Sequence, residues 1–212
     1  MITRICLVRH GETAWNAERR LQGHIDISLN ETGLAQANAT AINLTGQRFA
    51  AAYVSDLLRA RQTADAIAKR CAVVPNIDVH LRERHYGSFQ ALTYDEARQR
   101  FPQDYAHFEK RTPDYVFPGG GESLRQFSAR IHAVLHDIAE SHRGDIVLVV
   151  THGGVLDIAH RLATGKPLDA PRDFTIPNAA LNWIAWDGSA WSLIAWAEQA
   201  HLKQALDELP NA

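Results

Sequence analysis

The sequence predicts an α/β fold: a three-layer sandwich with a mostly parallel central sheet, helices on both faces and a C-terminal hairpin at one edge. Three observations favour this class. Short apolar runs alternate with segments of helical periodicity along the chain. Positions 146–150 read IVLVV, an unbroken apolar run rich in β-branched residues, which is typical of a strand covered on both faces. Two apolar runs, 181–186 and 191–196, flank an Asp-Gly pair and predict the hairpin.

The other elements follow from the same periodicities. We expect strands at 5–8, 51–55 and 145–150. Helices are expected from a cap at Asn30 to Gly46, from a cap at Asp56 onward, over 122–139, and from 153 to about 163. The inward faces of the first two helices are predicted to be Leu34, Ala37, Ala41 and Leu44, and then Ala60, Thr63, Ala64, Ile67 and Ala68. Residues 73–74 and 79–81 predict a short extended segment that leads to Glu83.

The length of the chain favours a single domain over residues 1–212, because 212 residues can bury a sizeable core. Within this domain we expect an inserted helical cap at about 92–121, where proline and glycine residues punctuate a weaker pattern.

The composition excludes several classes of partner. The formal net charge of -2 argues against nucleic acid, because phosphate contacts need a basic surface. No apolar stretch reaches the roughly 18 residues of a membrane span, and the N-terminal run is too short for a signal peptide. We therefore expect a cytoplasmic protein with no membrane partner. The two cysteines indicate neither a disulfide framework nor a CxxC metal site.

Unusual residues follow three of the predicted strands. Arg9 and His10 come directly after the first strand, Arg59 lies in the first helical turn after the second, and His152 and Gly153 follow the strand at 145–150. Because the carboxyl ends of parallel strands share one edge of an open sheet, we expect these side chains to meet there. Each alone is typical of a structural or surface residue, but together they indicate a site.

The side chains at these junctions suit an oxyanion better than a metal ion. Two guanidiniums would repel a divalent cation, and no Asp or Glu stands at the same junctions, so we predict no metal site. Arginine forks fit phosphate oxygens, and the backbone N–H groups of Gly11 and Gly153 can add donors. The nearby cations should also lower the pKa of His10 and keep its imidazole neutral and nucleophilic.

At these residues the sequence resembles the histidine phosphatase superfamily, which includes the phosphoglycerate mutases. Four ordered blocks carry the resemblance: LVRHGETAWN at 7–16, SDLLRARQTA at 55–64, LRERHYG at 81–87 and THGG at 151–154. The similarity runs from about residue 2 to residue 202.

The resemblance implies roles for particular residues of this sequence. His10 is implied to be the nucleophile that becomes phosphohistidine, and Glu83 the general acid and base. The implied ligands of the phosphoryl oxygens are Arg9, Arg59, His152, Asn16 and the Gly153 amide. Contacts to the rest of the substrate are expected from Gln22, Gly23, Arg61, Arg84 and Tyr86. The mechanism implied requires no cofactor.

Hydrolysis of a small phosphorylated metabolite is the favoured activity, with phosphoglycerate mutase as the alternative. The segment from Glu83 to His152 spans about 70 positions and is shorter than the insertion of the mutases that the family includes. It contains no adjacent Arg-Arg pair to hold a phosphoglycerate carboxylate, and Lys110-Arg111 is the nearest substitute. A third hypothesis, a non-catalytic phospholigand-binding protein, predicts the loss of at least one catalytic residue. The sequence retains all five of the implied ones: Arg9, His10, Arg59, Glu83 and His152.

Four of the five tryptophans, Trp183, Trp186, Trp191 and Trp196, lie in or near the predicted hairpin. We interpret them as core or edge packing, with a homodimer surface as the alternative.

Overall fold

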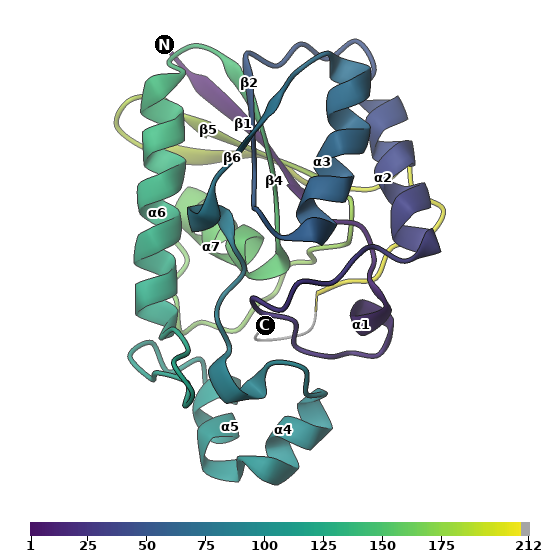
Figure 1. The fold of residues 1–212 in the computed structure, drawn as a ribbon. Helices are drawn as coiled ribbons and strands as arrows, with labels where there is room; N and C mark the ends of the chain where they lie inside the picture. The colour runs from purple at the N-terminus through teal and green to yellow at the C-terminus, as the bar shows by residue number, and fades with distance from the viewer. Residues whose placement is uncertain (209–212) are drawn as a thin grey trace.

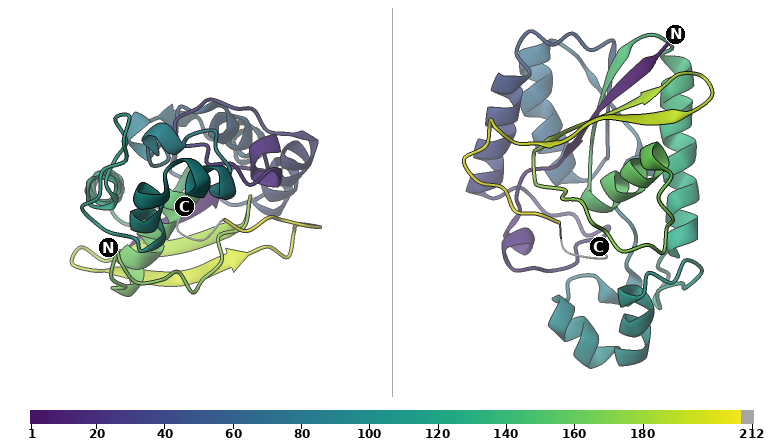
Figure 2. Two further views of the ribbon diagram at one scale, coloured as in Figure 1. Left: turned by 90° about the horizontal axis from the view of Figure 1, so that it is seen from below. Right: turned by 180° about the vertical axis from the view of Figure 1, so that it is seen from behind.

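The computed structural model describes residues 1–208, which form a six-stranded sheet flanked by helices (Figure 1). The strands are β1 (Thr3–Arg9), β2 (Ala51–Val54), β3 (Pro75–Ile77), β4 (Ile146–Thr151), β5 (Leu181–Trp186) and β6 (Trp191–Glu198). Their order in the sheet is β3-β2-β4-β1-β5-β6. The first four pair in parallel, whereas β5 and β6 pair antiparallel as a hairpin at one edge (Figure 2). The predicted fold class is confirmed.

Helices cover both faces of the sheet, and several shorter ones lie outside these two layers. They are α1 (Ala14–Ala17), α2 (Glu31–Asn43), α3 (Leu58–Cys71), the 3-10 turns η1 (Val79–Leu81) and η2 (Gly87–Phe89), α4 (Tyr94–Arg100), α5 (Pro102–Glu109), α6 (Leu124–Ser141) and α7 (Gly153–Thr164). Alternate residues of β1 point to opposite faces of the sheet. Ile5 and Leu7 pack with α6 and α7, while Cys6 and Val8 pack with α2 and α3. None of the helices described in residues 1–208 has the length and apolar character needed to cross a membrane.

Two details of α2 and α3 differ from the prediction. Asn30 caps α2 as expected and accepts a hydrogen bond from the Gly33 N–H at 2.8 Å, but Leu34 is half exposed rather than inward. The predicted cap at Asp56 is wrong, because no side-chain cap precedes α3. The Asp56 carboxylate instead accepts two hydrogen bonds from the Arg82 guanidinium, at 2.7 and 2.5 Å. That bidentate pair uses the acceptors that a cap would need.

The segments on either side of Glu83 also differ from the prediction. The strand lies at Pro75–Ile77 rather than at 73–74, and Val79–Leu81 forms a 3-10 turn rather than extended chain. Helix α6 begins at Leu124, because Ser123 caps it, so Glu122 lies before the helix and not within it.

The segment at 92–121 lies beyond the carboxyl ends of the parallel strands, where α4 and α5 stand apart from the sheet (Figures 1 and 2). Its aromatic side chains pack around Phe89 of η2, which contacts Tyr105, Phe108 and Phe117 with ring centroids 4.9–6.4 Å apart.

A buried ion pair joins this segment to α7. The Arg111 guanidinium donates to the Asp157 carboxylate at 2.6 Å, and both side chains are at most 4% exposed. Arg161 donates to the same carboxylate at 3.0 Å. Arg111 is therefore committed to a structural contact, which removes the predicted substitute for a carboxylate-binding arginine pair.

The tryptophans of the hairpin pack as predicted. Trp186 is buried, and its ring centroid lies 5.3 Å from that of Trp191. Its indole N–H donates to the Glu140 carboxylate at 2.5 Å. The indole of Trp196 donates to the carbonyl of Thr175 at 2.8 Å.

Candidate active site

The register of the sheet brings the first and fourth sequence blocks together. β1 and β4 are parallel neighbours in which Arg9 pairs with Thr151, so the next residues, His10 and His152, leave the same edge side by side. The N–H of His10 donates to the Thr151 carbonyl at 2.9 Å, and the two imidazole ring centroids lie 5.3 Å apart. The predicted convergence of the two histidines is therefore observed.

His10 is held with one ring nitrogen available for attack. Its Nδ1 lies 2.7 Å from the Gly11 carbonyl oxygen, which can only accept, so Nδ1 carries the proton and Nε2 keeps its lone pair. The side chain of Asn178 donates to the His10 carbonyl at 2.9 Å and fixes the main chain. Burial, followed by the charges of Arg59 and Arg9, lowers the pKa of His10 well below its usual value. The imidazole is therefore neutral near pH 7, as a nucleophile requires.

His152 is fully buried and is oriented by Ser55. Its Nε2 lies 2.8 Å from the Ser55 hydroxyl, and when that hydroxyl donates, Nδ1 carries the proton of the ring. Nδ1 has no hydrogen-bond partner among the described residues. Burial and the charge of Arg59 lower the pKa of His152 well below its usual value. The ring can thus offer a neutral N–H to an anion.

Arg59 is a buried cation fixed by the loop before α2. It donates to the carbonyl oxygens of Gly23 and Ile25 at 2.8 and 2.9 Å, while its Nε has no partner in the described part of the chain. Burial lowers the pKa of Arg59 to about 10, which still leaves it charged at neutral pH. The loop therefore positions a guanidinium without neutralising it.

Arg9 is 1% exposed and is held by two residues from the C-terminal part of the chain. Its Nη1 donates to the Ile176 carbonyl at 2.8 Å, and its Nη2 forms an ion pair with Glu208 at 2.8 Å.

Glu83 is buried against the N-terminus of α7. Its carboxylate accepts hydrogen bonds from the N–H groups of Arg84 at 2.7 Å and Gly154 at 3.0 Å. A Cβ at Gly154 would collide with this carboxylate, so the close approach requires glycine there. Burial, and next the charge of Glu208, raise the pKa of Glu83 to about 7, while the two amide hydrogen bonds and Arg59 oppose the rise. A carboxyl of this pKa can both donate and accept a proton at neutral pH.

One expected donor is not available. The N–H of Gly11 donates to the Thr63 hydroxyl at 3.0 Å, which itself donates to the Arg59 carbonyl at 2.9 Å. The Gly11 amide thus ties β1 to α3, so the prediction that it faces an anion is wrong.

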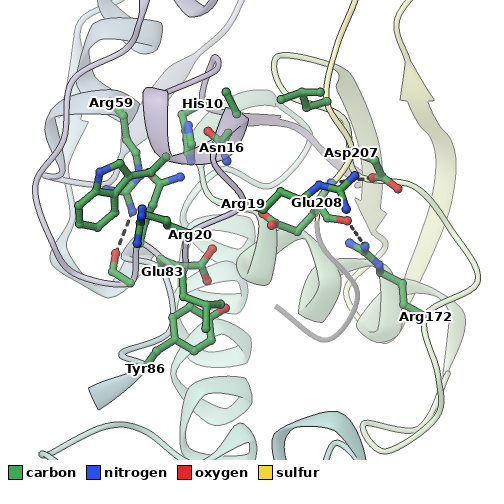
Figure 3. Close-up of a pocket in the computed structure, with 16 residues that line it drawn as sticks. His10, Asn16, Arg19, Arg20, Arg59, Glu83, Tyr86, Arg172, Asp207 and Glu208 are labelled. Carbon is green, nitrogen blue, oxygen red and sulfur yellow. Dashed lines mark hydrogen bonds between the residues drawn. The ribbon is translucent and has the colours of Figure 1, made fainter. Parts of the chain in front are cut away.

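A cavity of about 330 Å³ opens beside His10 (Figure 3). The predicted residues that line it are His10, Arg59, Glu83, Asn16, Gln22, Gly23 and Tyr86. Asn16 faces it because α1 begins with a capping box between Thr13 and Asn16. The Gln22 Oε1 and the Tyr86 hydroxyl are buried without a partner among the described residues, so both can meet polar groups of a ligand.

Five predicted residues do not line this cavity. Arg9, His152 and Gly153 are buried but are not among the residues that line it. Arg61 is exposed on α3 and away from the cavity. Arg84 is buried, donates to the Glu122 carbonyl at 3.1 Å and stacks over Phe117 at 4.5 Å.

Other lining residues were not predicted: Trp15, Ala17, Arg19, Arg20, Leu21, Arg172, Leu206, Asp207 and Glu208. Ser55, which orients His152, was also missed, although it directly follows β2 and the rule used for the other strand ends points to it. Arg172 and the segment 206–208 lie in irregular chain, where no periodic pattern gives a signal.

Known proteins are similar to this chain in sequence and in fold. A family profile described as "Histidine phosphatase superfamily (branch 1)" matches residues 5–199. An Arabidopsis thaliana protein named "Metal-independent phosphoserine phosphatase" is 42% identical over 203 residues, which cover 95% of this chain and 84% of that protein. "Phosphoglycerate mutase-like protein 4" of the same plant is 40% identical over 203 residues, covering 94% of this chain and 87% of that protein.

A solved structure extends the likeness to three dimensions. "Bacillus stearothermophilus YhfR" superimposes with a TM-score of 0.85 at 32% sequence identity, covering 94% of this chain and 98% of that one. The profile, the relatives and the shared fold together establish that this chain belongs to the histidine phosphatase superfamily.

Proposed function

We propose that this protein hydrolyses small phosphomonoesters without a metal ion, through a phosphohistidine at His10. The observation that carries the proposal is the state of His10: a buried, neutral imidazole with a free Nε2, next to His152 and two buried guanidiniums. The Nε of Arg9 and of Arg59 and the Nδ1 of His152 are buried with no partner in residues 1–208. Such unpaired donors are unfavourable unless an anion completes them.

The first half-reaction is a transfer from the substrate to the ring. His10 Nε2 attacks the phosphorus, the N–P bond forms, and the bond to the ester oxygen breaks in line. Glu83, whose raised pKa of about 7 keeps the protonated form populated at neutral pH, gives its proton to the departing alcohol. The cationic Arg59 stabilises the charge on the equatorial oxygens.

The second half-reaction regenerates the enzyme. The Glu83 carboxylate, now ionised, takes a proton from water while the water oxygen attacks the phosphorus. The N–P bond breaks, its electron pair returns to Nε2 of His10, and inorganic phosphate leaves. A single carboxyl with a pKa of about 7 suits both directions of proton transfer.

The cavity supports a small substrate that carries charge besides its phosphate. A volume of about 330 Å³ accommodates a metabolite, and Arg19, Arg20 and Arg172 line it beside Asp207. The relatives' names make phosphoserine and 3-phosphoglycerate the first substrates to test. Phosphoglycerate mutase is the second candidate function, favoured by the mutase-like relative, but Arg111 is bound to Asp157 and cannot hold the carboxylate of a phosphoglycerate.

The test measures hydrolysis and isomerisation in parallel in metal-free buffer with EDTA. Purified protein is given phosphoserine, or 3-phosphoglycerate with and without its bisphosphate primer, and the His10→Ala variant serves as control. We expect phosphate release from wild type, an acid-labile and base-stable phosphoenzyme, and neither from the variant. Primer-dependent isomerisation faster than phosphate release would favour the mutase, and activity in His10→Ala would contradict the covalent mechanism.

Three expectations from the sequence are retained as proposals. They are a single domain with an inserted helical cap at about 92–121, a homodimer surface on the hairpin as the alternative to edge packing, and a cytoplasmic location. Limited proteolysis, light scattering and cell fractionation test them in turn.

A further inference from the structure

The C-terminal tail returns to the cavity, where Leu206, Asp207 and Glu208 form part of the wall. Figure 3 shows Asp207 and Glu208 there, beside Arg172. Hydrogen bonds fix its course: the Asn178 N–H donates to the Leu206 carbonyl at 3.0 Å, and the Ile176 N–H donates to the Asp207 carboxylate at 2.5 Å. The Arg172 guanidinium donates to the Glu208 carbonyl. The tail is thus placed by several contacts and not by one side chain.

The Glu208 carboxylate lies where two kinds of anion-binding donor meet. Its Oε2 is 2.8 Å from Nη2 of Arg9, and its side chain is only 12% exposed. The atoms that a Cβ at Gly153 would strike first belong to the same carboxylate, so it also lies against the first residue of α7. A buried guanidinium and the N-terminus of a twelve-residue helix both favour an anion.

This carboxylate separates the cavity from two donors that the family resemblance assigns to the phosphoryl oxygens. Glu208 lines the cavity, whereas Arg9 and Gly153, which it contacts, do not. Glu83 is close enough for the charge of Glu208 to raise its pKa. A phosphate dianion that reached Arg9 while Glu208 stayed in place would meet two carboxylates, and like charges at this distance repel.

We propose that Glu208 is an internal competitor for the oxyanion subsite: its carboxylate occupies the position of a phosphoryl group at Arg9 and the start of α7, and must be displaced when a phosphoryl group binds. This proposal rests on the proposed function, which makes Arg9 a phosphoryl ligand. The apparent Kd for phosphate is then the intrinsic Kd divided by the fraction of molecules in which the tail is displaced.

The experiment titrates inorganic phosphate into wild type, Glu208→Gln and Glu208→Ala by isothermal calorimetry in metal-free buffer. Glu109→Gln is the matched control, because it makes the same change at an exposed residue outside the cavity. We expect the Kd for phosphate to fall roughly three- to tenfold in both Glu208 variants, the range set by one displaced ion pair. The Glu109 variant should keep the wild-type Kd.

The outcomes separate the two proposals. An unchanged Kd in both Glu208 variants, with phosphate bound by all proteins, overturns the competitor while leaving the proposed function intact. Weaker binding in both variants also overturns it, because Glu208 would then assist the ligand. If none of the proteins binds phosphate, the oxyanion site itself is overturned, and with it the proposed function.

Discussion

Replacing Glu83 by Gln removes a buried carboxyl whose pKa is about 7, against its usual 4.5. The protonated form is favoured in the folded state, because burial penalises the charge. Below about pH 4.5 the folded and unfolded chains both hold the proton, and the stabilisation from this group is fully present. As the pH rises through about 7 the unfolded chain ionises first, so stability is lost. The Gln variant carries no such loss.

The size of the effect follows from the two pKa values. Their separation, at about 1.4 kcal/mol per pH unit, corresponds to a loss of about 3 kcal/mol of wild-type stability across the window. Roughly 2 to 3 kcal/mol of it falls between about pH 5 and pH 8. The difference in unfolding free energy between wild type and Glu83→Gln should therefore move in favour of the variant by that amount.

The assay is urea denaturation of wild type and Glu83→Gln at about pH 5 and at about pH 8. Groups that titrate equally in both chains cancel in the difference. Glu122→Gln is the control, because the Arg130 hydrogen bond and charge lower the pKa of Glu122 despite the opposing effect of its burial. The stabilisation from a lowered pKa is lost only as the pH falls through that pKa, below this window, so the Glu122 difference should stay nearly constant between the two pH values. A Glu83 difference that does not depend on pH would refute the raised pKa and, with it, the acid role at neutral pH.

Other changes test the same site and its support. His10→Ala should abolish the phosphoenzyme trapped with labelled substrate, and any label surviving in base would identify another nucleophile. Ser55→Ala removes the hydrogen bond to His152, so we expect about 1 kcal/mol of lost transition-state stabilisation in kcat/KM with the fold intact by circular dichroism. Asp157→Asn leaves Arg111 and Arg161 facing each other in the interior and should lower unfolding free energy by about 3 kcal/mol, whereas an unchanged denaturation midpoint would show that the pair is not structural.

The sequence predicts most of the fold because its strong signals are local. The run at 146–150 forms β4, the Asp-Gly pair turns the hairpin, and Asn30 caps α2. The errors arise where a tertiary contact competes with a local preference. Asp56 is a good cap residue by type, but Arg82, distant in sequence, takes its carboxylate.

The centre of the site is predictable for the same reason. His10 and His152 follow β1 and β4, which are parallel neighbours in the sheet. The rule that parallel strands end at the same edge therefore brings the two residues together without knowledge of any side-chain contact. Arg61 and Arg84 are not predictable in this way, since their positions in the motif say nothing about which way each side chain turns. Arg84 is drawn away by the Glu122 carbonyl and the Phe117 ring.

The sequence by itself determined the family, the sheet and the meeting of His10 with His152 and the cationic residues Arg59 and Arg9, because strand order and motif spacing are encoded along the chain. Only the tertiary structure decided that the Glu83 pKa approaches 7, that Arg111 belongs to a buried ion pair, and that Glu208 returns to Arg9. These features depend on burial and on charges contributed by segments far apart in sequence. Desolvation and Coulomb energy act through space, and no local pattern carries them.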